Sequence, residues 1–275
     1  MAERVNSPQS LGPIPPDMLM LAYRSGIFPM ADSRDDPEVF WVEPRERAIL
    51  PLDGFHCSRS LARTLRRGRF RVTCNAAFAQ VIAQCAGPRR GKDGEGDGES
   101  WISTRILASY LELHRLGHAH SIECWQDGPD GKEQLVGGLY GVGFARVFCG
   151  ESMFSHVSDA SKVALAWLVA ALRRSGAELL DCQFITPHLA SLGTVEITQA
   201  RYVKMLKQAQ RPYAGGAAFG DGAGADGAAD GAGDGLAAAG APLALPDGFA
   251  ALLAAAGGSS SSPGNFITQS LTQTS

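Results

Sequence analysis

The sequence predicts a protein of the α/β (α+β) class, in which a mixed sheet is flanked by helices. From residue 69 onward, segments of alternating hydrophobicity and segments of helical periodicity succeed one another as strand, two helices, three strands, helix, strand and helix. With 275 residues, 45% of them apolar, the chain is long enough to bury one full-sized core and a small companion domain. A Gly/Ala-rich C-terminal stretch lacks this patterning.

Residues 1–56 are expected to form a small N-terminal domain. Asp17 is placed to cap the helix MLMLAYRSG, and Gly26 ends that helix. Between residues 38 and 56, Pro44 and Pro51 separate two short apolar runs, which indicates an irregular unit.

Residues 57–213 are expected to form the main domain, built around the mixed sheet. Asp159 is placed as the N-cap of its clearest helix, and DGPDGK supplies hairpin chemistry between two strands. The succession of elements resembles the fold of N-acetyltransferases, so we expect an acetyltransferase-like sheet. Helical periodicity marks residues 58–67, 76–86, 103–117, 159–176 and 198–209, and strand-like runs cover 69–74, 120–126, 133–144, 145–150 and 177–184.

Two segments are expected to lie outside the packed structure. Residues 87–99 are rich in Gly and charge, which indicates a flexible surface loop. Residues 214–275 combine Gly, Ala and Ser with five spaced aspartates, and such a composition buries too little apolar surface to offset its chain entropy. We interpret 214–275 as a disordered tail in which ALPDGFAALLAAA is only transiently helical, and we expect its deletion to leave activity intact.

Composition and targeting signals exclude several classes of protein. The six cysteines contain no C-x-x-C pair, which argues against a structural zinc site and a disulfide framework. The N-terminus lacks the apolar stretch of a signal peptide, and no apolar run is long enough to span a bilayer. We therefore expect a cytoplasmic protein with no membrane partner.

Basic side chains are concentrated in one short stretch. The net charge is −3, yet residues 1–213 carry 25 basic and 23 acidic side chains, a net charge of +2. Arginine forks bind phosphates in bidentate fashion, so a cluster of them favours sequence-independent binding to nucleic acid, and a solvated basic face is the alternative. Six arginines lie within thirteen residues, and the helical spacing places the first four largely on one side: Arg59, Arg63, Arg66, Arg67, Arg69 and Arg71.

Three polar residues mark the expected functional site. Glu151 follows Gly150 where we expect a strand to end, and Asp181 and Gln183 share one face of their strand. Asp181 has apolar neighbours that imply burial, and a buried carboxylate is costly unless it is hydrogen-bonded or paired. The group indicates a site that handles an amine, and an acid that caps a neighbouring helix is the alternative.

Other motifs are less informative. His114, His118 and His120 have no acid at ligand spacing, so structural roles are favoured and we expect no metal site. GGLYGVG falls within strands, where a nucleotide-binding loop is not expected. Ser152 lacks the second glycine of a serine-hydrolase elbow, which makes it a poor nucleophile candidate.

Several longer blocks, in order from about Asp17 to Tyr202, resemble one family. They are AYRSGIFPM, SRSLARTL, WISTRILASYLELHRLGHAHSIECW, LVGGLYGV, FCGESMFS, DASKVAL, LLDCQF and TPHLASLG. Together they are similar to the leucyl/phenylalanyl-tRNA–protein transferase family. The resemblance implies transfer of Leu or Phe, and less readily Met, from aminoacyl-tRNA to proteins with N-terminal Arg or Lys, which marks them for degradation through the N-degron route. It also implies a small N-terminal domain before an acetyltransferase-like catalytic domain, and we expect a monomeric enzyme without cofactors.

The resemblance also implies roles for individual residues. Glu151 resembles the acid that binds the acceptor's basic N-terminal residue, and Asp181 and Gln183 resemble the pair that orients and deprotonates the attacking amine. Trp101 is similar to an aromatic residue that stacks on the terminal adenine, and the arginine cluster is similar to a surface for the tRNA acceptor stem. Six residues fall at positions similar to those that line the aminoacyl pocket: Leu139, Phe148, Met153, Leu165, Leu168 and Leu180.

The sequence departs from the family pattern near the expected adenosine site. Met30 occupies the place of the second adenine-stacking aromatic, so stacking there is expected to be weaker or differently shaped. The W-W-S-P motif is present only as FWVEP, residues 40–44.

The sequence argues against two other classes of protein. An acetyl-CoA-dependent acetyltransferase needs a glycine-bearing loop ahead of its long helix, and MFSHVSDASK contains no glycine. A non-catalytic RNA-binding module would leave Glu151, Asp181 and Gln183 unexplained.

Overall fold

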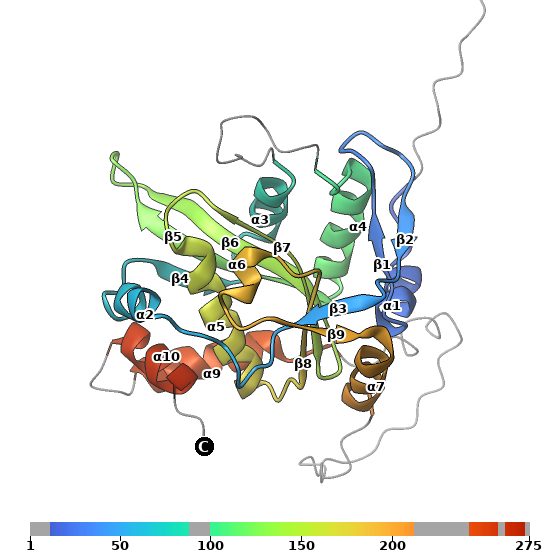
Figure 1. Ribbon diagram of the computed structural model, residues 1–275. Helices are drawn as coiled ribbons and strands as arrows, with labels where there is room; N and C mark the ends of the chain where they lie inside the picture. The colour runs from blue at the N-terminus through green and yellow to red at the C-terminus, as the bar shows by residue number, and fades with distance from the viewer. Residues whose placement is uncertain (1–11, 88–99, 212–241, 258–261, 273–275) are drawn as a thin grey trace, which may run out of the picture.

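A mixed seven-stranded sheet forms the centre of the protein (Figure 1). The computed structural model describes residues 12–87, 100–211, 242–257 and 262–272. Its strands are β1 (Phe28–Met30), β2 (Phe40–Val42), β3 (Glu46–Ile49), β4 (Arg71–Cys74), β5 (Ala119–Asp127), β6 (Glu133–Phe144), β7 (Val147–Ser155), β8 (Leu179–Gln183) and β9 (Val195–Thr198). The sheet has the order β4-β5-β6-β7-β8-β3-β9, and β1 pairs separately with β2. Only β7 and β8 are parallel neighbours among these strands, so the predicted mixed α/β class is confirmed.

Helices cover both faces of the sheet, and each face has its own hydrophobic cluster. One face carries α1 (Pro16–Arg24), α3 (Phe78–Cys85), α4 (Thr104–Arg115) and α7 (Gln199–Ala209). The other carries α2 (Arg59–Arg66), α5 (Ala160–Arg174), the short α6 (Pro187–Ala190), α9 (Leu245–Gly257) and α10 (Pro263–Thr272). Strand side chains alternate between the two clusters: Leu180 faces α5, whereas Leu179 faces the opposite layer.

Helix α5 is the centre of one layer, and it is buried on almost every side. Its sequence, ASKVALAWLVAALRR, is apolar all round, as expected for a helix with little contact with water. Asp159 occupies the predicted N-cap position, but its φ is +70° and its side chain makes no capping bond. Its carboxylate instead accepts hydrogen bonds from Lys162 (3.2 Å) and Thr64 (3.4 Å). The predicted start of the helix is thus confirmed, and the predicted capping chemistry is wrong.

The interpretation of 214–275 as a disordered tail is wrong for its last part. Residues 245–257 and 263–272 are helices that pack on α5 and α2 (Figure 1). Leu252 of α9 and Ile267 of α10 are 1% and 0% exposed, because they cover the side of α5 that would otherwise meet water. The rest of the predicted tail up to residue 241 lies outside the described residues, as does nearly all of the predicted 87–99 loop.

The N-terminal unit is smaller than the predicted domain of residues 1–56. Strand β3 lies between β8 and β9 in the main sheet, so residues 46–49 belong to that sheet and not to a separate domain. Asp17 lies in the first turn of α1 rather than at its N-cap, which is Pro15. Within the described residues, no helix is long and apolar enough to cross a membrane.

Candidate active site

The parallel strands β7 and β8 separate from each other halfway along β7. They pair from Val147–Leu179 to Cys149–Asp181, whereas β7 continues along β6 as far as Ser155. Along β6, Tyr140 pairs with Ser152 and the next residue, Gly141, pairs with Gly150, so Glu151 is the extra residue of a β-bulge. The prediction that the strand ends near residue 150 is therefore wrong, because Glu151 lies inside β7 at the fork between the two strands.

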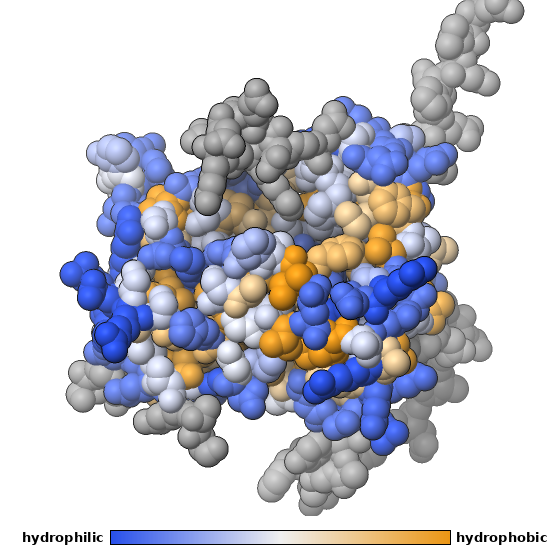
Figure 2. All heavy atoms as spheres, viewed as in Figure 1, coloured by the Kyte–Doolittle hydropathy of each residue, from blue (hydrophilic) through white to orange (hydrophobic). Residues whose placement is uncertain are grey.

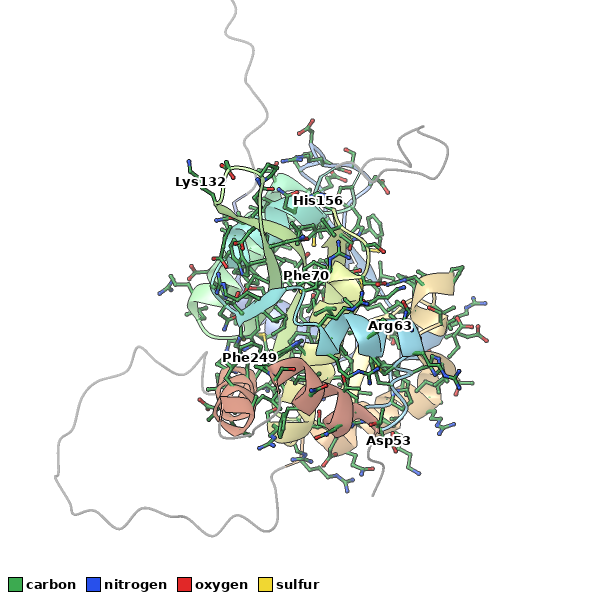
Figure 3. All side chains as sticks on the ribbon, turned by 90° about the vertical axis from the view of Figure 1, so that its left-hand side faces the viewer. Asp53, Arg63, Phe70, Lys132, His156 and Phe249 are labelled. Atoms are coloured by element: carbon green, nitrogen blue, oxygen red, sulfur yellow. The ribbon has the colours of Figure 1, made fainter. Side chains whose placement is uncertain are left out.

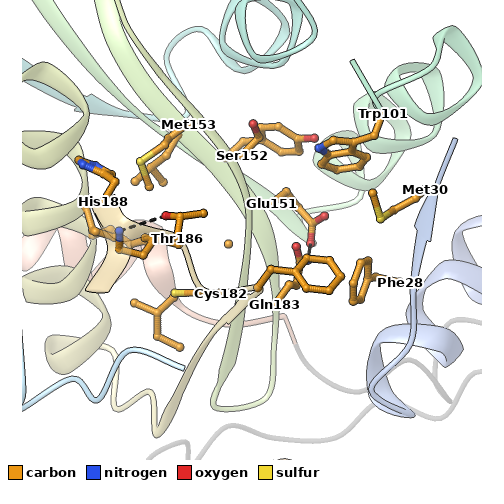
Figure 4. A pocket seen from close by; sticks show the side chains of 18 residues that line it. Phe28, Met30, Trp101, Glu151, Ser152, Met153, Cys182, Gln183, Thr186 and His188 are labelled. Atoms are coloured by element: carbon orange, nitrogen blue, oxygen red, sulfur yellow. Dashed lines mark hydrogen bonds between the residues drawn. The ribbon is translucent and has the colours of Figure 1, made fainter. Parts of the chain in front are cut away.

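A cavity of about 440 Å³ opens at this fork. Trp101, Met30 and Phe28 stand together at one end, and Met153, Thr186 and His188 at the other (Figure 4). Glu151 and Gln183 lie between these two groups. The cavity is therefore a mainly apolar pocket with a carboxylate and an amide near its middle, which is a common design of small-molecule sites.

Glu151 is a buried carboxylate with an unusual pKa. Its side chain accepts hydrogen bonds from Nε2 of Gln183 (2.9 Å) and from the hydroxyl of Tyr110 (3.2 Å). Tyr110 is hydrogen-bonded to Tyr23, and burial raises the pKa of both tyrosines, so both are neutral. Burial also raises the pKa of Glu151 to about 7, although the hydrogen bonds it accepts oppose the shift. A cation that entered the pocket would favour its charged form.

Asp181 lies behind the pocket and does not line it. The side chain is 0% exposed and forms a bidentate ion pair with Arg47, with N–O distances of 2.6 and 2.9 Å. It also accepts hydrogen bonds from the hydroxyl of Tyr202 (2.9 Å) and from the backbone N–H of Gln183 (2.8 Å). Asp181 is therefore placed to hold Gln183, and the implied direct role in deprotonating an amine does not fit this position.

Gln183 adopts a backbone conformation that few non-glycine residues tolerate. Its φ is +62°, and such strain persists only where the surroundings fix it. The backbone N–H of Gln183 donates a hydrogen bond to Asp181, and its side-chain Nε2 donates one to Glu151, so both the backbone and the side chain are fixed. The structure thus brings Glu151, Asp181 and Gln183 together as the sequence predicts, with Gln183 as the link.

Arg47 is a functional residue that the sequence analysis missed. It lies on β3, is 2% exposed, donates to the carbonyl of Gly26 and stacks between the rings of Phe28 and Tyr202. Burial opposes its charge, but the hydrogen bond and the charge of Asp181 outweigh burial and raise the pKa of Arg47. The expected burial of Asp181 implied that its carboxylate has a partner. It did not indicate that the partner is Arg47, which lies 134 positions away in the sequence.

Five of the six predicted aminoacyl-pocket residues line the cavity. They are Leu139, Met153, Leu165, Leu168 and Leu180. Phe148 does not line it, because this residue is 0% exposed in the core and its ring packs against Gly141. The predicted adenosine residues Trp101 and Met30 do face the cavity together, and the carbonyl of Trp101 accepts a hydrogen bond from the residue after Met30, at 3.2 Å.

The arginine cluster forms an exposed face of α2. Ser58 caps this helix, Leu61 and Leu65 are buried, and Arg59, Arg63, Arg66 and Arg67 are exposed. Figure 2 shows strongly hydrophilic side chains over α2, and Figure 3 labels Arg63 on it. Arg71 lies apart on β4, where it pairs with Glu133.

The three histidines pack among other side chains. His114 stacks on Phe78 with 4.2 Å between ring centroids, and its Nδ1 lies 2.8 Å from the carbonyl of Ala119. Burial lowers the pKa of His120 to about 4. In the part of the chain that the structure describes, no three His, Cys, Asp or Glu side chains group as metal ligands.

The mixed sheet carries a mainly apolar cavity that contains a buried carboxylate and an amide, an arrangement that suits an enzyme of the acyltransferase class. Comparison with known proteins identifies the family within this class. The leucyl/phenylalanyl-tRNA protein transferase family matches residues 49–207, and the N-terminal domain of that family matches residues 12–45.

Relatives of the same name support this match. A leucyl/phenylalanyl-tRNA–protein transferase of Novosphingobium aromaticivorans is 67% identical over 95% of this chain and 97% of its own. Those of Rhizorhabdus wittichii and Zymomonas mobilis are 55% and 56% identical, over 75% and 73% of this chain and 79% and 71% of their own. The chain belongs to the leucyl/phenylalanyl-tRNA protein transferase family and is an aminoacyltransferase.

Proposed function

We propose that this enzyme transfers Leu or Phe, and less readily Met, from aminoacyl-tRNA to the α-amine of proteins that begin with Arg or Lys. The observation that carries the proposal is the position of Glu151: a buried carboxylate hydrogen-bonded to Gln183, inside a mainly apolar pocket. The anionic group suits a cationic acceptor, and the apolar cavity next to it suits an uncharged aminoacyl side chain.

The apolar walls select the donor. The aminoacyl side chain lies among Leu139, Met153 and Leu165, and the terminal adenosine lies between Trp101 and Met30. Each buried methylene contributes about 0.8 kcal/mol, so Leu and Phe bind better than Ala. A β-branched side chain is disfavoured by shape rather than by hydrophobicity.

Glu151 selects the acceptor. An Arg or Lys side chain brings its positive charge to the carboxylate, which lowers the pKa of Glu151 from its raised value and keeps it ionised. An acidic N-terminal residue would place a second negative charge in the same buried site. The enzyme therefore discriminates acceptors by charge at this one residue.

Gln183 orients the attacking amine. Its Nε2 donates to Glu151, which leaves the amide oxygen as the group that accepts a hydrogen bond from the α-amine. The aminoacyl ester is already activated, so the remaining task is to hold an unprotonated amine against the carbonyl, and orientation alone supplies about 7–11 kcal/mol. Asp181 acts as a positioning residue because it holds the backbone of Gln183.

The arginine face of α2 holds the tRNA. Arg59, Arg63, Arg66 and Arg67 are exposed on one side of the helix, where their guanidinium groups meet the phosphates of the acceptor stem without reading its sequence. In the cell the enzyme works as a cytoplasmic monomer and marks its acceptor proteins for degradation through the N-degron route.

A competition between donors tests the proposal. Purified enzyme is offered Phe-tRNA and acetyl-CoA together, with peptides that begin with Arg or with Asp as acceptors. We expect phenylalanine to be attached to the Arg peptide alone, with no acetylation, as read by mass spectrometry. Acetyl transfer, or equal modification of the Asp peptide, would contradict the donor or the acceptor assignment respectively.

A further inference from the structure

The C-terminal helices α9 and α10 complete the hydrophobic core on one side of the sheet. Leu245, Phe249 and Leu252 of α9, with Ile267 and Leu271 of α10, are 4% exposed or less. The ring of Phe249 lies 5.4 Å from that of Trp167 in α5. The family match ends at residue 207, so both helices lie outside the matched residues.

Helix α10 is docked closely against the last turn of α2. Gly264 approaches the α2 backbone so nearly that an added Cβ would lie 1.7 Å from the carbonyl oxygen of Leu65. Ser262, just before α10, donates from its hydroxyl to the carbonyl of Arg66 at 3.4 Å. The positive N-terminal end of α10 thus meets the carbonyl end of α2, an arrangement that the two helix dipoles favour.

The same helix is also fixed to α5. Arg173 donates to the carbonyl of Ser270 at 2.6 Å, and the guanidinium of Arg174 lies 5.4 Å from the ring centroid of Phe266. Figure 3 shows α2 resting on α10. Helix α10 therefore links α2 to α5 through contacts with both helices.

We propose that α9 and α10 act as a clasp that positions the arginine face of α2 for tRNA binding. The inference rests on the proposed contact between α2 and tRNA phosphates. Bidentate arginine–phosphate contacts need a defined geometry, so a displaced helix loses contacts even when its arginines are intact. No pocket-lining residue comes from α9 or α10, so the clasp affects tRNA binding and leaves the chemistry at Glu151 unchanged.

Two glycine substitutions provide a matched test. Gly264→Ala forces α10 away from α2, whereas an added Cβ at Gly257, near the end of α9, has no atom within 4 Å. For Gly264→Ala we expect a several-fold higher KM for Phe-tRNA, with kcat and the KM for an Arg peptide unchanged. The slope of log affinity against log salt should decrease by about 1 for each arginine displaced from its phosphate. Gly257→Ala should match the parent enzyme in every measurement.

Two further variants separate a folding defect from a failure of the proposed tRNA contact. Ser262→Ala removes one exposed hydroxyl, which donates to the carbonyl of Arg66 and accepts from the backbone N–H of Asn265 in the first turn of α10. The core is undisturbed, so this variant should shift the tRNA KM in the same direction even if Gly264→Ala folds poorly. The double variant Arg63→Ala/Arg66→Ala, with the clasp intact, tests the α2 contact itself. An unchanged tRNA KM in the arginine variant would overturn that contact. If the arginine variant binds tRNA more weakly but Gly264→Ala and Ser262→Ala keep the parent KM and salt slope, the clasp is overturned and the α2 contact stands. A loss confined to kcat in the two clasp variants would also overturn the clasp.

Discussion

The ion pair between Arg47 and Asp181 offers the most direct test of how the site is held together. Arg47→Met removes a guanidinium that is 2% exposed and leaves a carboxylate that is 0% exposed, with no cation to balance it. The methionine keeps the apolar stem between Phe28 and Tyr202, so packing changes little while the charge is lost. The substitution therefore removes the positive charge together with its hydrogen bonds to Asp181 and to the carbonyl of Gly26.

The expected effect is large because both partners are buried. Removal of one partner from a buried pair costs about 3–5 kcal/mol, since the other charge is left uncompensated. For a chain of this size, that corresponds to a lower melting temperature by about 6–20 °C. The backbone of Gln183 loses a fixed anchor, so we also expect a lower kcat. Arg115→Met, which breaks the exposed pair with Glu112, should change neither stability nor kcat measurably.

A second substitution separates charge from position. In Arg47→Met/Asp181→Asn both charges are gone, but the asparagine oxygen can still accept the N–H of Gln183. If Asp181 is a positioning residue, the double variant should recover most of the stability in denaturant unfolding and most of the kcat. A stable but inactive double variant would refute the positioning role and assign catalysis to the charge of Asp181. Parent-like stability of Arg47→Met would refute the importance of the pair.

The remaining predictions concern Glu151 and the C-terminal helices. Glu151→Gln should raise the KM for Arg and Lys peptides selectively in steady-state assays, and an unchanged acceptor preference would remove the role of Glu151. The pKa of Glu151 is raised from 4.5 to about 7, so the folded state binds this proton more tightly than the unfolded state. Its contribution to stability is complete below pH 4.5 and is lost as pH rises through about 7, a change of about 3 kcal/mol. In chemical denaturation, the free energy of unfolding of Glu151→Gln should lack this pH-dependent part. If the parent and the variant show the same dependence of the free energy of unfolding on pH, Glu151 is not its source. Leu252→Ala should lower the free energy of unfolding by about 2–5 kcal/mol because Leu252 is 1% exposed in α9, whereas Leu253→Ala, at a site 44% exposed, should have little effect. Equal, small effects would restore the interpretation of the tail as unpacked.

The sequence was sufficient for the elements whose signal is local. The periodicity of 159–176 predicted α5, and the arginine spacing predicted the exposed face of α2 opposite Leu61 and Leu65. The apolar residues on both faces of 177–184 predicted β8 and the burial of Asp181. These signals are local because a helix or strand repeats its buried face every few residues.

The C-terminal helices show where composition misleads. Their Ala- and Gly-rich sequence has little apolar surface of its own, so it predicted disorder. Yet α5 is apolar all round, and such a helix needs cover on every side. The surface that stabilises α9 is supplied by α5, which lies far away in the sequence, and a window of the tail alone does not contain that information.

By itself, the sequence determined the mixed α/β class, the family, the proximity of Glu151, Asp181 and Gln183, and the basic face of α2. Only the tertiary structure decided that Glu151 occupies a bulge inside a strand, that Arg47 holds Asp181 behind the pocket, and that the C-terminal helices support α2. The physical reason is the same in each case. Residue type and spacing fix which face of an element is buried, whereas the partner of a buried charge or an apolar face is chosen by long-range packing.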